Sequence, residues 1–106
     1  MTEDTQDIIQ LGGNIELLGF REVERINNVV INKIIGNYAR KFSEVGKNFE
    51  KLHIQLKKVH DNENPKMQLN AKVMDNGKVF ASEVTDRNLY FALDAVLKNI
   101  KAEMEK

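Results

Sequence analysis

Two stretches of alternating apolar and polar side chains, at 51–59 and 67–73, dominate the second half of the chain, and a further strand candidate follows at 78–84. Alternation with a period of two is typical of strands that bury one face. The tripeptide Asp-Asn-Gly at 75–77 joins the second stretch to this candidate, and Asn-Gly suits the positive φ angles of a tight hairpin turn. Residues 61–65 have the composition of a turn. The pattern therefore predicts an antiparallel meander of three strands.

Two segments with a helical period flank this meander. From Glu22 to about Glu44, apolar residues recur at steps of three and four and predict one buried stripe. That stripe comprises Ile26, Val29, Val30, Ile34, Tyr38 and Phe42. We expect Gly46 to end this helix, and Thr85 or Asp86 to cap a last helix. The buried face of the last helix comprises Leu89, Leu93, Val96, Leu97 and Ile100.

A further strand is expected at about 8–17, where Gly12-Gly13 indicates a bulge or a close backbone approach. The fold class is then α+β with the order β-α-β-β-β-α, a four-stranded sheet with two helices packed on one face. The opposite face should be open to solvent or to a partner. We expect it to carry His53, Gln55, Lys57, Gln68, Asn70, Lys72 and Ser82.

Length and composition fit one domain without covalent staples. The chain has 106 residues and no cysteine, which removes disulfides, thiolate metal sites and cysteine nucleophiles. We expect residues 1–7 to be a disordered acidic segment and residues 8–106 to form a single domain. The N-terminus lacks a signal-peptide pattern, and no apolar run approaches the roughly 20 residues that span a bilayer. The expectation is a cytoplasmic protein that does not contact a membrane.

Charge is balanced in total but not along the chain. Residues 1–20 carry four acids and no base, whereas residues 21–58 carry nine bases against four acids, a net charge of +5. A neutral total can therefore conceal a basic face. The alternative is a solvated helix surface with ordinary ion pairs.

No arrangement of residues predicts catalysis. His53 and His60 lack a third metal ligand at a usual spacing, and Gly12-Gly13 lacks the residues of a phosphate-binding loop. The aromatic residues Tyr38, Phe42 and Tyr90 lie on apolar stripes and are expected to pack in the core. We therefore expect no enzyme activity, no cofactor, no metal and no small-molecule substrate.

Two segments resemble a known family. Residues 76–82 (Asn-Gly-Lys-Val-Phe-Ala-Ser) lead into 86–94 (Asp-Arg-Asn-Leu-Tyr-Phe-Ala-Leu-Asp), and 12–17 read Gly-Gly-Asn-Ile-Glu-Leu. These segments are similar to bacterial ribosome hibernation-promoting factors and ribosome-associated inhibitor A, over about residues 8–101. The resemblance is to the short form, without a C-terminal dimerisation domain. This sequence departs from the family either in two extra residues between Asp86 and Leu89 or in which acidic residue is matched.

The resemblance implies a β-α-β-β-β-α fold that binds the small ribosomal subunit near its decoding region and inhibits translation under stress. Basic side chains on rigid elements would meet phosphates of ribosomal RNA. The expected rRNA-binding residues are Arg25, Lys33, Arg40, Lys41, Lys57, Lys72, Lys98 and Lys101. Asn99, Ala102 and Glu103 stand where family members often carry Lys, Arg or Gln, so the last helix is less basic than in the family.

Two other functions remain open from the sequence. One is a different RNA-binding domain of similar layout, for example one that binds double-stranded RNA. The other is a protein-interaction or self-associating module that uses a strand edge or the open sheet face, as exposed edges readily pair. A homodimer is thus a further partner to test beside the ribosome.

Overall fold

The computed structural model describes residues 8–11, 14–20, 28–59 and 66–106. Its strands are β1 (Ile8–Leu11), β2 (Ile15–Leu18), β3 (Phe49–Val59), β4 (Lys66–Asp75) and β5 (Lys78–Asp86). Its helices are α2 (Asn28–Val45) and α3 (Leu89–Met104). The expected turn at 61–65, the N-terminal segment 1–7 and the start of the predicted first helix lie outside the described residues.

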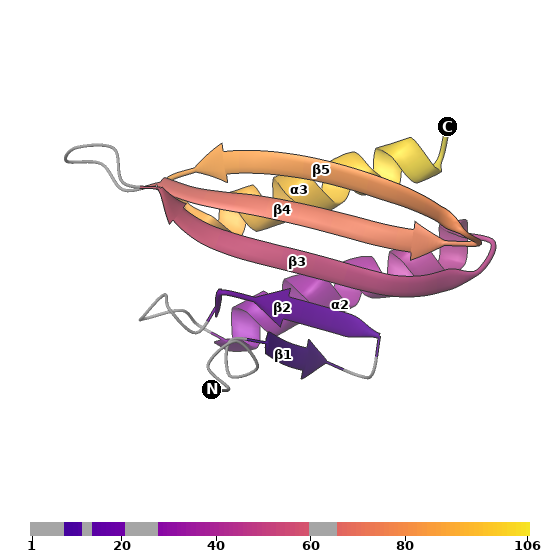
Figure 1. The fold of residues 1–106 in the computed structure, drawn as a ribbon, viewed down its shortest axis with the longest axis horizontal. Helices are drawn as coiled ribbons and strands as arrows, with labels where there is room; N and C mark the ends of the chain where they lie inside the picture. Colours follow the sequence, from indigo (N-terminus) through magenta and orange to yellow (C-terminus); the bar gives the residue numbers. More distant parts are fainter. Residues whose placement is uncertain (1–7, 12–13, 21–27, 60–65) are drawn as a thin grey trace.

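The strands form one mixed sheet in the order β1-β2-β3-β4-β5, and both helices lie behind it in Figure 1. β2 pairs parallel with β3, and β3, β4 and β5 form the predicted antiparallel meander. The predicted α+β order β-α-β-β-β-α, with β2–β5 as four strands and two helices on one face, is confirmed. The two helices run parallel to each other because both follow strands of the same direction (Figure 1).

The segment predicted as one strand over 8–17 forms two strands. Ile8 pairs with Leu18 and Leu11 with Ile15, so the chain reverses between β1 and β2 and adds a short edge strand. A pair of glycines in an apolar segment permits a reversal as well as a bulge, and alternation alone does not separate them. After β2, Gly19 adopts a φ of +87° and approaches the carbonyl of Leu56, which leaves no room for a side chain.

The core lies between the sheet and the helices. Its fully buried members include Leu52, Ile54, Leu69 and Val73 of the sheet. From α3 it includes every residue expected on the buried face, Leu89, Leu93, Val96, Leu97 and Ile100, together with Ala92. The expected core aromatics are confirmed, since Tyr38 and Phe42 are buried and Tyr90 packs against the cluster.

The buried stripe of α2 differs from the predicted one at its beginning. Ile31 and Ile35 are buried with Tyr38 and Phe42, whereas Val29 and Val30 are 68% and 38% exposed. Consecutive apolar residues allow two adjacent stripes, and packing on the sheet selects the one that continues through Phe42. The helix ends at Val45, and the N–H of Gly46 donates to the carbonyl of Phe42, so the predicted stop is confirmed.

Two further details of the sheet and its last helix correct the sequence analysis. Ser82 lies on the helix side, where its Oγ accepts a hydrogen bond from Asn99 (3.3 Å), because it pairs with buried Ala71. The N-cap of α3 is Asn88, whose side chain accepts from the N–H of Phe91 (3.0 Å). The predicted caps were too early because β5 continues through Asp86.

The β4–β5 turn is the predicted Asn-Gly hairpin. Asn76 and Gly77 have φ angles of 52° and 81°, and Asp75 pairs with Lys78. Two positive φ angles in succession define a type I′ turn. The carboxylate of Asp75 also accepts hydrogen bonds from the N–H groups of Lys47 (3.1 Å) and Asn48 (2.9 Å), so it fixes the α2–β3 connection to the hairpin.

Candidate nucleic-acid interface

The helix layer brings together five of the eight basic residues expected to contact RNA. Lys33 and Arg40 are exposed on α2, seven residues apart and therefore on one side of the helix. Lys98 is exposed on α3. Lys41 and Lys101, on α2 and α3 respectively, are half-buried. The two helices lie side by side behind the sheet, so these residues all belong to the helix layer (Figure 1).

A hydrogen bond joins α2 and α3 where the two helices meet, which is called the seam below. The hydroxyl of Tyr38 donates to Oδ1 of Asp94 across the seam (2.9 Å), and the ammonium of Lys41 lies 4.9 Å from the centre of the Tyr38 ring. Burial, and then the hydrogen bond to Asp94, raise the pKa of Tyr38 to about 12. The Asp94 carboxylate is thus engaged between the helices, and the Lys41 ammonium lies over the ring of the tyrosine that engages it.

The last helix offers less free positive charge than the first. Nζ of Lys101 pairs with Glu105 (2.7 Å), and Nζ of Lys106 pairs with Glu103 (3.1 Å). Within Leu89–Met104 the two lysines are balanced by Asp94 and Glu103. In contrast, α2 contains three basic residues and one acidic residue.

The two strand lysines among the expected residues lie on the other side of the molecule. Lys72 pairs with His53 and Lys57 with Gln68, and these positions alternate with the buried residues of β3 and β4. The open sheet face therefore carries Lys57 and Lys72, and a single flat contact with the helix layer does not include them. Arg25 lies outside the described residues.

The open face has its own ion pairs. Glu16 on β2 is 3.1 Å from Nζ of Lys51 and 3.4 Å from Nδ1 of His53. Gln68 donates to Glu83 across β4 and β5. These contacts lower the free charge of the sheet face and explain His53 as a half-buried strand residue beside a carboxylate. His60 lies outside the described residues.

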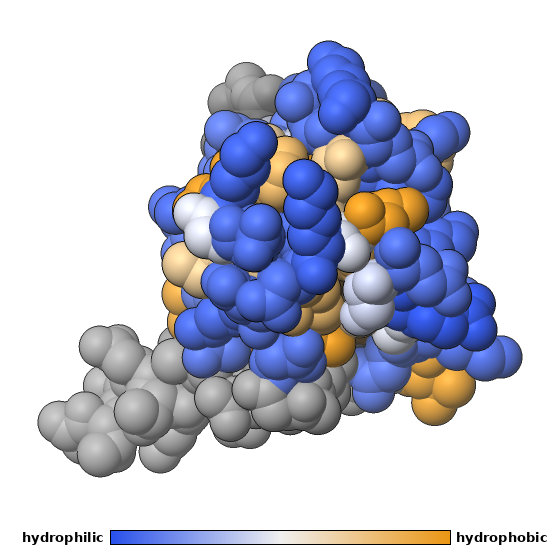
Figure 2. Space-filling model, turned by 90° about the vertical axis from the view of Figure 1, so that its right-hand side faces the viewer, coloured by the Kyte–Doolittle hydropathy of each residue, from blue (hydrophilic) through white to orange (hydrophobic). Residues whose placement is uncertain are grey.

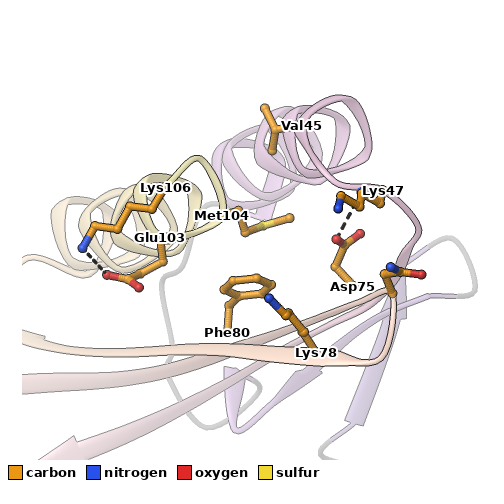
Figure 3. A pocket seen from close by; sticks show the side chains of 9 residues that line it. Val45, Lys47, Asp75, Lys78, Phe80, Glu103, Met104 and Lys106 are labelled. Atoms are coloured by element: carbon orange, nitrogen blue, oxygen red, sulfur yellow. Dashed lines mark hydrogen bonds and ion pairs between the residues drawn. The ribbon is translucent and has the colours of Figure 1, made fainter.

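Sequence reasoning missed a cluster of three lysines at one end of the molecule. Lys47, Lys78 and Lys106 line a pocket of about 250 Å³ between the ends of both helices and the β4–β5 turn (Figure 3). Asp75 and Glu103 also line it and are already engaged, Asp75 by backbone N–H groups and Glu103 by Lys106 (Figure 3). Figure 2 shows this end as mainly hydrophilic, with isolated apolar patches. The lysines come from three distant segments, so no local pattern reveals them.

The described residues include neither a cluster of metal-binding side chains nor a membrane-spanning helix. No group of three or more His, Cys, Asp or Glu side chains among these residues could hold a metal ion. None of the described helices is long and apolar enough to cross a membrane. The exposed Lys and Arg side chains of the helices are able to bind anionic groups.

Comparison with known proteins finds similarity of structure. No family model matches the chain, and no curated protein matches its sequence. The N-terminal domain of Thermus thermophilus protein Y superposes with a TM-score of 0.57 at 15% identity, over 80% of this chain and 88% of that one. A ribosomal subunit interface protein from Coxiella burnetii superposes with a TM-score of 0.53 at 14% identity, over 78% and 85%.

These two structures share the fold described above. The resemblance that the sequence predicted is therefore confirmed at the level of the fold.

Proposed function

We propose that the protein is a ribosome-associated dormancy factor that binds RNA of the small ribosomal subunit and inhibits translation under stress. The observation that carries the proposal is the placement of cationic side chains on both helices of one face, in a fold shared with a ribosomal subunit interface protein. The residues of this contact are Lys33, Arg40, Lys41, Lys98 and Lys101, with Arg25 as a further member.

The protein would act by occupying a site on the ribosome. Lysine and arginine attract phosphates without regard to sequence, and the rigid parallel helices supply a shape that fits structured RNA. The inhibitor would act by filling a site in the cytoplasmic ribosome, with no bond made or broken. It would need no cofactor, metal or small-molecule substrate.

The test is cosedimentation of the protein with purified small subunits at low salt. The double variant Lys33→Glu/Arg40→Glu reverses charge on exposed positions of α2, and we expect it to weaken binding by about tenfold or more. The matched control Lys57→Glu/Lys72→Glu makes the same change on the opposite face and should bind nearly as the wild type does. Both pairs are exposed, so neither variant disturbs the core.

Three outcomes would contradict the proposal in different ways. A wild-type protein that stays off small subunits at low salt ends it. Loss of binding in the sheet-face variant alone moves the interface to the open face. Equal affinity for small subunits and for a plain RNA duplex favours a general RNA-binding domain over a ribosome factor.

A further inference from the structure

The outer edge of β5 is long and regular. No strand in the described part of the chain pairs with this edge, whereas the opposite edge strand β1 has only four residues. β5 has nine residues, no proline and an uninterrupted register with β4. Exposed edges are usually protected by short length, proline, bulges or charges that point inward. Along its middle β5 has no proline, no bulge and no charge that points inward; Glu83, the charged residue there, accepts a hydrogen bond from Gln68 on the open sheet face.

Four residues of β5 have backbone N–H and C=O groups that are not used in pairing with β4. The two-residue turn makes Asp75 and Lys78 a hydrogen-bonded pair, and such pairs alternate along an antiparallel ladder. The N–H and C=O groups of alternate β5 residues therefore point away from β4. These residues are Val79, Ala81, Glu83 and Thr85.

The sequence of β5 is complementary to itself in the antiparallel direction. With a two-fold axis at Ser82, all four outward-directed residues pair with one another, 79 with 85 and 81 with 83. The same register places Lys78 opposite Asp86 of the second copy, twice, and Phe80 opposite Val84. Oppositely charged and apolar cross-strand pairs stabilise a sheet. We propose that two copies of the chain dimerise through antiparallel pairing of their β5 edges.

The flank of α3 fits this arrangement. β5 and α3 border an open groove of about 410 Å³ lined by Ser82, Asn99 and Ala102, among others. α3 contacts both β4 and β5, so the two-fold axis would bring the two α3 helices to roughly 10 Å, a normal packing distance. Phe91 of α3 is 64% exposed in the single chain. The dimer would have a continuous sheet with all its helices on one face.

The test measures the mass of the full chain by sedimentation equilibrium from micromolar to millimolar concentration. We expect a concentration-dependent dimer. Lys78→Glu and Asp86→Lys each place two like charges opposite each other in a homodimer, so each alone should weaken dimerisation by about tenfold or more. Mixed together, the two variants restore both opposite-charge pairs and should associate.

Two controls keep this result specific. Ala81→Pro removes an outward N–H without removing a bond to β4, so it should lower dimerisation while circular dichroism remains that of the wild type. Lys33→Glu makes the same charge change as Lys78→Glu on the helix face and should leave the dimer intact. A wild type that stays monomeric at every concentration overturns the proposal. It is also overturned by a dimer that ignores these β5 substitutions, or by folded charge variants that fail to associate when mixed.

Discussion

At the scale of single residues, Asp75 is the buried charged side chain of the described core. It is 6% exposed and accepts from the backbone N–H groups of Lys47 and Asn48. Replacing it with alanine leaves both N–H donors without the carboxylate that they share. We expect Asp75→Ala to lower the free energy of unfolding by about 1–3 kcal/mol, measured by urea denaturation. Asp86→Ala, which removes an exposed acceptor, should cost less.

Tyr38 makes the stability of the protein depend on pH in the alkaline range. Its pKa is raised from 10.0 to about 12 by burial and by the hydrogen bond to Asp94, so the folded state favours the neutral phenol. The stabilisation is fully present below pH 10 and is lost as the pH rises through about 12.

We expect the unfolding free energy of the wild type to fall more steeply over this range than that of Tyr38→Phe. The comparison cancels the titration of lysines common to both proteins. Absorbance at alkaline pH should show one tyrosine fewer ionising at about pH 12 in the variant. Parallel stability curves for the two proteins would contradict the assignment.

At the scale of elements, the start of α3 depends on its cap. Asn88→Ala removes the acceptor for the N–H of Phe91 and should destabilise the protein by about 1 kcal/mol. Thr85→Ala changes an exposed residue within β5 that the sequence suggested as a cap, and its cost should be smaller. Thermal unfolding of the two variants compares the observed cap with the predicted one. A larger loss for Thr85→Ala would place the helix start earlier.

Replacement by alanine should change the stability of the protein in opposite directions at two glycines, one within α2 and one after β2. Gly36 lies in α2 with open space around it, so Gly36→Ala should stabilise the protein by about 0.5–1 kcal/mol. Gly19 has a positive φ and lies against the backbone carbonyl of Leu56, so Gly19→Ala should destabilise it. Urea denaturation of both variants tests whether the backbone conformation at each glycine decides the sign of the change in unfolding free energy.

Local patterns predicted the elements well where one arrangement alone satisfied them. The alternation in β3 and β4 allows one structural interpretation, and so does the Asn-Gly turn, and these predictions were confirmed. Ambiguity arose where the sequence offered two choices. Val30 and Ile31 could both begin a buried stripe, and Asp86 and Asn88 could both cap a helix. Packing against the sheet and the length of the β4–β5 ladder made those choices, and neither is a local property.

The candidate interface shows the same limit at the scale of the whole molecule. The sequence identified basic residues but not which of them share a face, because that depends on the topology. The structure separates Lys57 and Lys72 on the sheet from Lys33, Arg40 and Lys98 on the helices. The zero net charge of the chain therefore does not show how its charges are divided between the two faces.

The uneven charge of the two helices predicts how binding to small subunits depends on salt. Each phosphate contact contributes a slope of roughly 0.7–0.9 to the fall of log K with log salt concentration. Arg40 is exposed and none of the ion pairs described above involves it, so Arg40→Gln should reduce the slope by about that amount.

Lys101 is held by Glu105 at 2.7 Å and must break this pair to reach a phosphate. Lys101→Gln should therefore reduce the slope by less than Arg40→Gln does. Equal reductions in the two variants, measured by cosedimentation over a salt series, would show that α3 contributes to the contact as much as α2.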